Sequence, residues 1–350
     1  MSKRIPVAVL GATGMVGQYF VSLTANHPWF ELTAVVASDR SAGKRYADAC
    51  HWHLGAEIPE AARDLEVLPI GADVDARVVF SALPSDVAGE VEVDYAKKGH
   101  YVFSNASNHR MDPLVPLLIP EVNHEHSAIL REQQRRKGWS GYIVTNPNCC
   151  AAVLVTALDP LQKTFGLDKV LVTTLQSVSG AGYPGLPSLD ILDNAIPYIG
   201  GEEPKLEEEQ LKMLGRYADN AIVFAQFTMS AHCNRVATRE GHLECVSAAL
   251  RTTATVDDVA EAFRSYTSLP QQLGLPTAPA HPVILRTEPN RPQTRLDRDA
   301  GNGMSVSVGR IRECPILGVK FVALGSNVMR GAAGGSVLNA ELLKAQGLLD

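Results

Sequence analysis

Two adjacent cysteines stand where an apolar run ends and a helical pattern begins. Cys149 and Cys150 follow the segment YIVTNPN (142–148), and the other four cysteines lie far apart in the chain. Pro147 fits just before a helix and Asn148 is a favourable N-cap residue, so the spacing predicts a helix that begins at Cys149. A thiol at this position lies in the positive potential of the helix N-terminus, which lowers its pKa towards a reactive thiolate.

Cys150 lies one position further along and is turned by about 100° around the helix axis. The apolar residues that follow, AAVLVTAL (151–158), predict a buried helix. We therefore interpret Cys150 as a small packing residue. The residues alone leave Cys149 open between a nucleophile and a structural thiol.

A reactive thiolate needs a partner that handles protons. The segment HCNRVATREGHLECVS (232–247) contains His232 and His242, and Arg235 precedes His242 by seven residues. If the chain bends at REG (239–241), Arg235 and His242 both project into one pocket. The pattern alone does not separate a catalytic His242 from a structural one.

A glycine-rich turn near the N-terminus predicts a dinucleotide site. The segment VAVLGATGMVGQYF (7–20) ends a strand and opens a helix, and its three glycines are spaced G-x-x-G-x-x-G. Such glycines permit a tight turn, the close approach of a pyrophosphate and close packing of the helix on the strand, while the helix N-terminus supplies N–H donors. The predicted cofactor-binding residues of this loop are Gly11, Thr13, Gly14, Met15, Val16 and Gly17.

The end of the next expected strand distinguishes NADP from NAD. The segment VVASDRSAGK (35–44) offers the hydroxyls of Ser38 and Ser41 and the planar cation of Arg40. These groups suit a ribose 2′-phosphate and favour NADP. NAD becomes plausible if Asp39, in the same segment, faces the ribose instead.

The elements that must position these residues change in character half-way along the chain. In the first half, short apolar runs alternate with helical patterns, which is typical of a parallel sheet covered on both faces. The expected strands are 5–11, 31–38, 76–84, 100–107 and 141–146, and the expected helices are 15–26, 86–99 and 126–138.

In the second half, the strand candidates are longer and closer together, which favours a mixed or antiparallel sheet. They are 169–180, 221–229, 242–252, 282–289, 304–313 and 318–327, with helices expected at 206–219, 255–266 and 334–349. We place the domain boundary near Cys149. Residues 1–149 are expected to form the first domain, 150–327 the second, and 328–350 to pack back on the first.

The composition of the chain excludes several classes of protein function. The chain has 350 residues, 45% hydrophobic and 20% charged, which predicts a soluble globular protein of two domains. The net charge is −6 and the richest basic stretch, REQQRRKG (131–138), is short, so we expect no nucleic-acid partner. We expect no signal peptide and no membrane span. Six cysteines without a C-x-x-C pair predict reduced thiols in the cytoplasm and no metal site.

Taken together, the motifs resemble the aspartate-semialdehyde dehydrogenase family, in the branch found in archaea and fungi. The motifs are GATGMVG (11–17), SNHRMDPLVPLLIPEVN (107–123), NPNC (146–149), LQSVSGAG (175–182), EQLK (209–212), NRVATREGH (234–242) and RGAAGGSVLNAEL (330–342). The resemblance covers nearly the whole chain. It implies an α/β fold, with an N-terminal Rossmann-type NADP-binding domain and an α+β catalytic and dimerisation domain like that of glyceraldehyde-3-phosphate dehydrogenase.

The resemblance implies roles for the positions that match the family motifs. Cys149 matches the nucleophile, His242 the acid/base and Gln176 the residue that orients the acyl intermediate. The implied substrate-binding residues are Arg110 and Lys212 for the phosphate, with Asn108 beside them, Arg235 for the carboxylate and Glu209 for the amino group. The further implied cofactor-binding residues are Ser81, Ser179, Gly180 and Asn327. The chain departs from the family at Cys150, where relatives often carry Ser or Thr, and at Ala237, where they often carry Pro.

The implied activity is the NADP-dependent reductive dephosphorylation of L-aspartyl-4-phosphate to L-aspartate 4-semialdehyde through a cysteine thioacyl intermediate. This step belongs to lysine (diaminopimelate), methionine and threonine biosynthesis, and the enzyme is expected to be a homodimer or homotetramer.

Three alternatives remain. A malonyl-CoA reductase would use the same cysteine, although Glu209 argues against a substrate without an amino group. An N-acetyl-γ-glutamyl-phosphate reductase should show a different cysteine motif. A non-catalytic NADP-binding regulator would not need Cys149, Gln176, Arg235 and His242 together.

Overall fold

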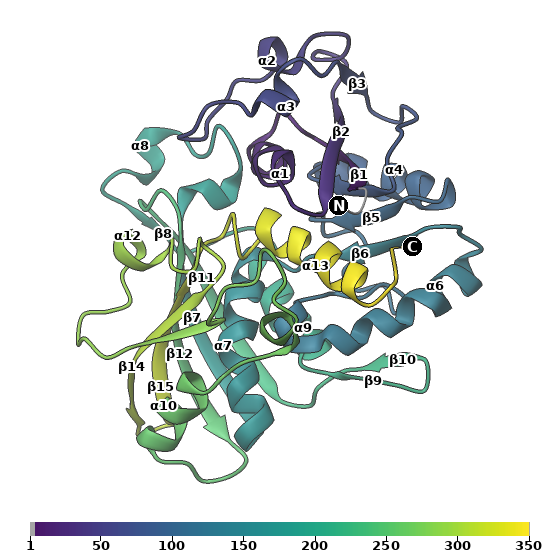
Figure 1. The fold of residues 1–350 in the computed structure, drawn as a ribbon. Helices are drawn as coiled ribbons and strands as arrows, with labels where there is room; N and C mark the ends of the chain where they lie inside the picture. Colours follow the sequence, from purple (N-terminus) through teal and green to yellow (C-terminus); the bar gives the residue numbers. More distant parts are fainter. Residues whose placement is uncertain (1–3, 350) are drawn as a thin grey trace.

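A computed structural model describes residues 4–349, which form two large sheets (Figure 1). The first sheet has six strands in the order β3-β2-β1-β4-β5-β6, and its neighbouring strands pair in parallel. Its strands are β1 (Ile5–Leu10), β2 (Phe30–Ala37), β3 (Val67–Pro69), β4 (Val78–Ser81), β5 (Tyr101–Ser104) and β6 (Tyr142–Thr145).

The near-continuous apolar runs of these strands are explained by burial on both faces. Val7 and Val9 of β1 belong to one hydrophobic cluster, whereas Ala8 and Leu10 belong to a second cluster on the opposite face. Successive side chains of a strand point to opposite faces, so both faces need a cover. The helical elements of this half are α1 (Met15–Ala25), α2 (Tyr46–Ala49), α3 (Glu60–Arg63), α4 (Ser85–Lys97), α5 (Pro120–Asn123), η1 (His124–Ala128) and α6 (Ile129–Lys137). The prediction of a doubly covered parallel sheet is confirmed.

The second sheet has seven strands in the order β13-β14-β15-β12-β7-β11-β8. The pairs β13–β14 and β7–β11 are parallel and the remaining pairs are antiparallel, so the predicted mixed sheet is also confirmed. Its strands are β7 (Leu167–Gln176), β8 (Ala195–Ile196), β11 (Thr228–Val236), β12 (His242–Leu250), β13 (Val283–Arg286), β14 (Val306–Cys314) and β15 (Gly318–Gly325).

The hydrophobic core of the second half lies between this sheet and the apolar sides of its long helices. The helical elements are α7 (Cys149–Phe165), η2 (Val178–Ala181), α8 (Ser188–Ile191), α9 (Glu202–Met213), α10 (Val256–Arg264), α11 (Leu269–Gln272) and α12 (Thr294–Asp297).

Two boundaries in the second half differ from the prediction. The helix expected at 206–219 ends at Met213, and a small hairpin follows, with β9 at Arg216–Ala218 and β10 at Ala221–Val223. Asp219 and Asn220 form its two-residue turn with φ of 52° and 58°, a conformation that Asp and Asn tolerate. The strand expected at 221–229 is therefore split between β10 and β11. Sequence analysis also missed the short edge strand β3.

The C-terminal segment returns to the first half of the molecule. Helix α13 (Ala333–Ala345), yellow in Figure 1, contributes Val337 and Leu342 to the same hydrophobic cluster as β1 and α1. Just before it, the guanidinium of Arg330 forms a fully buried ion pair with Glu121, at 2.6 and 2.9 Å. The domain ranges themselves stay a prediction, and residues 1–3 and 350 of those ranges lie outside the described residues.

Candidate active site

Helix α7 begins at Cys149, as the sequence predicted. The side-chain oxygen of Asn148 accepts hydrogen bonds from the main-chain N–H groups of Cys150, at 2.9 Å, and Ala151, at 3.2 Å. This is a regular N-cap, which satisfies donors that the first helical turn would otherwise leave unpaired. The side chain of Cys149 is half-buried, whereas that of Cys150 is fully buried in the core of the second half.

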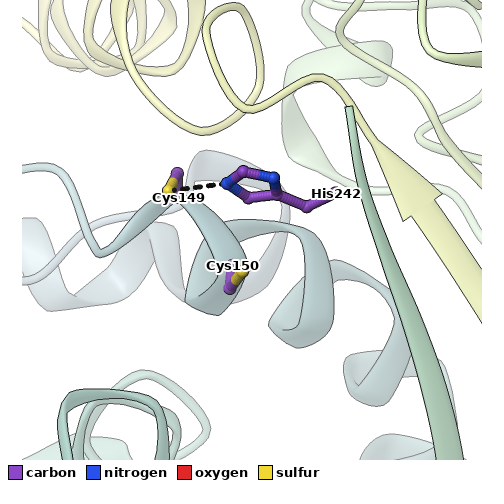
Figure 2. Close-up of side chains that lie close together, drawn as sticks. All are labelled: Cys149, Cys150 and His242. Atoms are coloured by element: carbon purple, nitrogen blue, oxygen red, sulfur yellow. Dashed lines mark hydrogen bonds between the residues drawn. The ribbon is translucent and has the colours of Figure 1, made fainter. Parts of the chain in front are cut away.

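Cys149 points towards a histidine from the second sheet (Figure 2). Its Sγ lies 3.1 Å from Nε2 of His242, the first residue of β12. The main-chain N–H of Ser177 donates to Nδ1 of the same ring at 3.1 Å. Because Nδ1 accepts this bond, the neutral ring carries its proton on Nε2 and donates it to the sulfur.

The pKa of the Cys149 thiol is held well below its usual value. The main cause is the neighbouring thiol of Cys150, and the hydrogen bond from His242 and the positive charge of Arg110 act in the same direction. These groups stabilise the thiolate against the opposing effect of burial. The arrangement can therefore present a nucleophilic sulfur.

The predicted bend after β11 brings Arg235 and His242 to one place. Nη1 of Arg235 donates to the carbonyl of Ser177 at 2.7 Å. Both side chains lie close to Gly180. A Cβ added at Gly180 would lie 2.7 Å from Nη1 of Arg235 and 3.2 Å from the His242 ring. Gln176 ends β7 and pairs with Arg235 across the parallel ladder, and its buried amide donates to Thr174 at 3.3 Å.

A cavity of about 310 Å³ lies in front of Cys149. Met15 and Val16 of the glycine loop line it, so it joins the predicted nucleotide site to the sulfur. Its ionisable lining includes Arg110, Glu202 and Lys205, and it also contains Cys149, Asn148, Ser179, Gly180 and Asn327. An acidic group and two cations beside a thiolate suit a substrate that carries an amino group and a phosphate.

The EQLK motif does not supply these cavity groups. Nζ of Lys212 is buried and donates to three main-chain carbonyls, those of Arg110, Asp112 and Val115, at 2.6, 2.8 and 2.8 Å. An ammonium group has three protons, so none is left for a phosphate. Burial lowers the pKa of Lys212 to about 8. Lys212 thus fixes the loop that carries Arg110, and the phosphate contact expected of it does not fit its geometry.

Two further predicted substrate residues are also turned away from the cavity. Glu209 is buried, and its carboxylate is shared between Arg110 and the main chain of Asn148. Asn108 is exposed on the surface, and its amide donates to the carbonyl of Ser85 at 2.9 Å. Of the five predicted substrate residues, Arg110 lines the cavity and Arg235 adjoins it through Gly180.

Sequence reasoning missed Glu202 and Lys205 in the segment GEEPK (201–205). They repeat the E-x-x-K spacing of 209–212 seven residues earlier on α9. Seven residues are close to two helical turns, so both pairs lie on the same side of the helix at different heights. The amide of Asn148 donates to both carboxyl oxygens of Glu202, at 2.9 and 2.6 Å. The duplicated spacing was the available signal, but only the fold shows which pair reaches the cavity.

The glycine loop has the shape that a dinucleotide needs. Gly11 has φ of 72°, and Gly14 occupies the N-cap of α1 without a side chain over the free N–H groups. At Gly17 an added Cβ would lie 2.1 Å from the carbonyl oxygen of Gly11, so only glycine lets the helix approach the turn this closely. The loop therefore fits a pyrophosphate.

The other predicted cofactor residues lie in three different places. Ser38 and Arg40 are exposed and Ser41 is half-buried in the turn that follows β2, next to the glycine loop in sheet order. Ser179 and Asn327 lie in the cavity and are joined by a 2.9 Å hydrogen bond. Ser81, by contrast, is fully buried at the end of β4.

Comparisons with known proteins show the family of the chain. The family profile described as "Semialdehyde dehydrogenase, NAD binding domain" matches residues 6–129, and "Semialdehyde dehydrogenase, dimerisation domain" matches residues 158–330. An aspartate-semialdehyde dehydrogenase of Archaeoglobus fulgidus is 52% identical over 97% of this chain and 98% of its own. The chain belongs to the aspartate-semialdehyde dehydrogenase family.

Further members of the family are close in sequence and in structure. The aspartate-semialdehyde dehydrogenase of Cryptococcus neoformans is 48% identical over the full length of both chains. A crystal structure of the Candida albicans enzyme with NADP superposes with a TM-score of 0.91, at 42% identity, over 99% of this chain and 100% of that one. A malonyl-CoA reductase (NADP) of Metallosphaera sedula is 40% identical over 100% of this chain and 99% of its own. Among residues 4–349, no helix is long and apolar enough to cross a membrane.

Proposed function

We propose that this chain catalyses the NADP-dependent reductive dephosphorylation of L-aspartyl-4-phosphate to L-aspartate 4-semialdehyde, a step of lysine, methionine and threonine biosynthesis. The observation that carries the proposal is the 3.1 Å contact between Cys149 Sγ and His242 Nε2 beside a cavity lined by Arg110, Glu202 and Lys205. A thiolate, a proton-bearing partner and charges of both signs meet there.

Substrate binding follows from the charges that line or adjoin the cavity. We assign the phosphate to Arg110 and Lys205, because Lys212 has no free donor. We assign the amino group to Glu202, because Glu202 lines the cavity and Glu209 does not. Arg235 would hold the carboxylate, and Gln176 keeps its proposed role of orienting the acyl group.

The thiolate of Cys149 attacks the acyl phosphate carbon, the C–O bond to phosphate breaks, and a thioester forms. The departing phosphate carries negative charge that the two cations offset. The positive potential at the start of α7 lies beside the reacting carbon and stabilises the carbonyl oxygen as it becomes an oxyanion. The lowered pKa of Cys149 favours the ionised sulfur that this step needs.

NADPH, when bound on the glycine loop and the 38–41 turn, supplies the hydride that reduces the thioester carbon. His242 keeps a proton on Nε2, directed at the reacting sulfur and at an oxygen bound to the same carbon. As the C–S bond breaks, the aldehyde leaves and the sulfur regains the hydrogen bond from Nε2. In the reverse direction the same nitrogen handles the proton of the thiohemiacetal.

One pair of assays tests the proposal. NADP+ reduction is measured with aspartate semialdehyde and phosphate, and NADPH oxidation is measured with malonyl-CoA. We expect activity in the first assay and its loss in Cys149→Ala, while Cys245→Ala, which removes an exposed thiol of β12, keeps it. Activity on malonyl-CoA alone would overturn the proposal, and full activity in Cys149→Ala would remove the assigned nucleophile.

We also propose a cytoplasmic homodimer, with a tetramer as the larger alternative. One face of the second sheet packs against the core, while side chains of the other face are exposed, among them Leu171, His232 and Cys245. A face of this kind suits a second copy of the chain around a two-fold axis. The six free thiols suit a reducing compartment. Light scattering on Leu171→Asp, beside the unaltered protein, tests the interface, and an unchanged mass would contradict it.

A further inference from the structure

One residue beside the active site bonds to three of its proposed members. Ser177 follows β7 directly and is fully buried. Its main-chain N–H donates to Nδ1 of His242 at 3.1 Å, and its carbonyl oxygen accepts Nη1 of Arg235 at 2.7 Å. Its hydroxyl donates to Oδ1 of Asn327 at 3.3 Å. Because Ser177 is buried behind these side chains, it can act on a substrate only through them.

A main-chain donor fixes the orientation of the Asn327 amide. The N–H of Gly241, at the bend before β12, donates to Oδ1 of Asn327 at 2.9 Å. The amide oxygen must therefore face the bend, since a flipped amide would place its NH₂ group against another donor. The NH₂ group of Asn327 in turn donates to Oγ of Ser179 at 2.9 Å.

Three side chains then close a ring of hydrogen bonds. Nδ1 of His242 has one lone pair, which the main-chain N–H of Ser177 already uses, although the Ser177 hydroxyl also lies 3.3 Å away. The hydroxyl proton of Ser177 is therefore left for Asn327, and Ser177 Oγ accepts the hydroxyl of Ser179 at 3.2 Å. The bonds run from Asn327 to Ser179, on to Ser177 and back. Hydrogen bonds that point the same way strengthen one another.

We propose that Ser177 is a positioning residue that keeps the Nε2 proton of His242 directed at Cys149. Its N–H occupies Nδ1 and leaves the ring proton on the other nitrogen, 3.1 Å from the sulfur. Its hydroxyl, held in the ring of hydrogen bonds, keeps this N–H from turning away. Because Ser179 and Asn327 line the cavity, the same ring ties the orientation of His242 to the side of the cavity where we expect the cofactor.

The proposal rests on the roles proposed above for Cys149 and His242 but not on the identity of the substrate. Other charged or titratable groups also face this pair. They are Arg110 on the loop before α5, Cys150 on α7, Glu202 and Lys205 on α9, Arg235 on β11 and Glu244 on β12. All of them stay unchanged in the variants below, so a change at Cys149 can be traced to Ser177 and His242.

The experiment measures the pH dependence of the rate at which iodoacetamide alkylates Cys149, with the site located by tandem mass spectrometry. In Ser177→Ala the hydrogen bond from His242 to the thiolate should weaken, and the midpoint should rise by about 0.5–1 pKa unit. That shift is roughly a three- to tenfold loss of thiolate at pH values below the midpoint. Ser127→Ala removes a buried hydroxyl of η1 that bonds to Gln346, and it should keep the midpoint of the unaltered protein.

A second substitution shows whether the effect passes through His242. In His242→Ala the midpoint should rise further, and adding Ser177→Ala to this variant should have no additional effect. A residue that only supports packing would shift the midpoint by the same amount with or without His242. That result, or an unchanged midpoint in Ser177→Ala, would overturn the proposal.

Ser179→Ala breaks the ring of hydrogen bonds at another member and gives an independent comparison if Ser177→Ala does not fold. It should raise the Cys149 midpoint when His242 is present and leave it unchanged in His242→Ala. An equal shift in both backgrounds, or no shift in either, would contradict the proposal. Because alkylation needs no substrate, a failed activity assay is distinguishable from a failure of Ser177 to position His242.

Discussion

One carboxyl oxygen of Glu209 accepts the main-chain N–H of Asn148, the residue that caps α7, at 2.6 Å. The other oxygen accepts Nη1 of Arg110 at 3.0 Å. The same carboxylate therefore holds the cap of the nucleophile's helix and a cation of the proposed phosphate site. Since both contacts are buried, they fix the spacing between the sulfur and the phosphate group.

Glu209→Gln should damage stability and activity together. The amide keeps one acceptor, but its NH₂ group faces a donor on the other side, so either Arg110 or Asn148 loses its partner. Breaking a buried charge pair costs about 3–5 kcal/mol. We expect a fall of that order in the free energy of unfolding and at least a roughly tenfold fall in kcat/KM. Urea unfolding and steady-state kinetics measure both. The neighbouring exposed Glu208→Gln is the matched control, and equal results for the two variants would contradict the assignment.

Substitutions of two lysines on α9 should separate an effect on phosphate binding from an effect on stability. Lys205→Met removes a cation of the cavity and should raise KM for phosphate about tenfold or more, with an unchanged melting temperature. Lys212→Met leaves three carbonyls without their donor and should lower the melting temperature by several degrees. Kinetics in phosphate and differential scanning calorimetry distinguish these outcomes. A stable Lys212→Met protein that no longer binds phosphate would reverse our assignment.

Arg40→Ala should change cofactor preference. If the guanidinium pairs with a 2′-phosphate, its removal should raise KM for NADP+ roughly tenfold and leave KM for NAD+ unchanged. Steady-state kinetics with both cofactors give the ratio. Arg131→Ala, at an exposed position of α6, controls for the loss of one surface charge. An equal effect of Arg40→Ala on both cofactors would instead favour Asp39 as the residue that faces the ribose.

The buried carboxyl group of Glu92 should make the free energy of unfolding depend on pH. Its carboxyl group is fully buried on α4, accepts the hydroxyl of Ser104 at 2.8 Å, and burial raises its pKa from 4.5 to about 7. The pKa of Glu92 is higher in the folded protein than in the unfolded chain, so the folded state holds the proton more tightly. The stability that this gives is fully present below pH 4.5 and is lost as the pH rises from 4.5 through 7. Glu92→Gln cannot titrate, so relative to the unaltered protein it should gain on the order of 3 kcal/mol across that window. Urea unfolding at several pH values measures the difference. The exposed Glu90→Gln should show none of it.

The sequence predicted those features of the fold that depend on short-range residue patterns. The start of α7 at Cys149 followed from Pro147 and Asn148, and the glycine loop followed from its place between a strand and a helix. The face of a helix could also be predicted, because E-x-x-K recurs on one side of α9. Which E-x-x-K pair meets the cavity depends on how far α9 extends past α7, and this is a tertiary relationship that no local pattern contains.

The hairpin at 216–223 and the orientation of Asn108 were missed for related reasons. The segment 206–219 reads as one amphipathic helix, but Gly215 approaches the backbone of Val223 so closely that an added Cβ would lie 2.2 Å from its carbonyl oxygen. The chain therefore leaves the helix there. Asn108 belongs to the same motif as Arg110, two residues away, yet the turn sends one side chain to the surface and the other to the cavity.

The return of α13 to the first sheet has a consequence for how the protein is made. Val337 and Leu342 complete a hydrophobic cluster that begins with Val7, so more than 300 residues separate the parts of one core. During synthesis, the glycine loop and its strands leave the ribosome long before the helix that covers them. The first half must therefore wait, incompletely packed, until the residues of α13 have been added. Chaperone contacts with the emerging chain would be expected to concentrate on the sides of α1, β4 and β5 that α13 later covers.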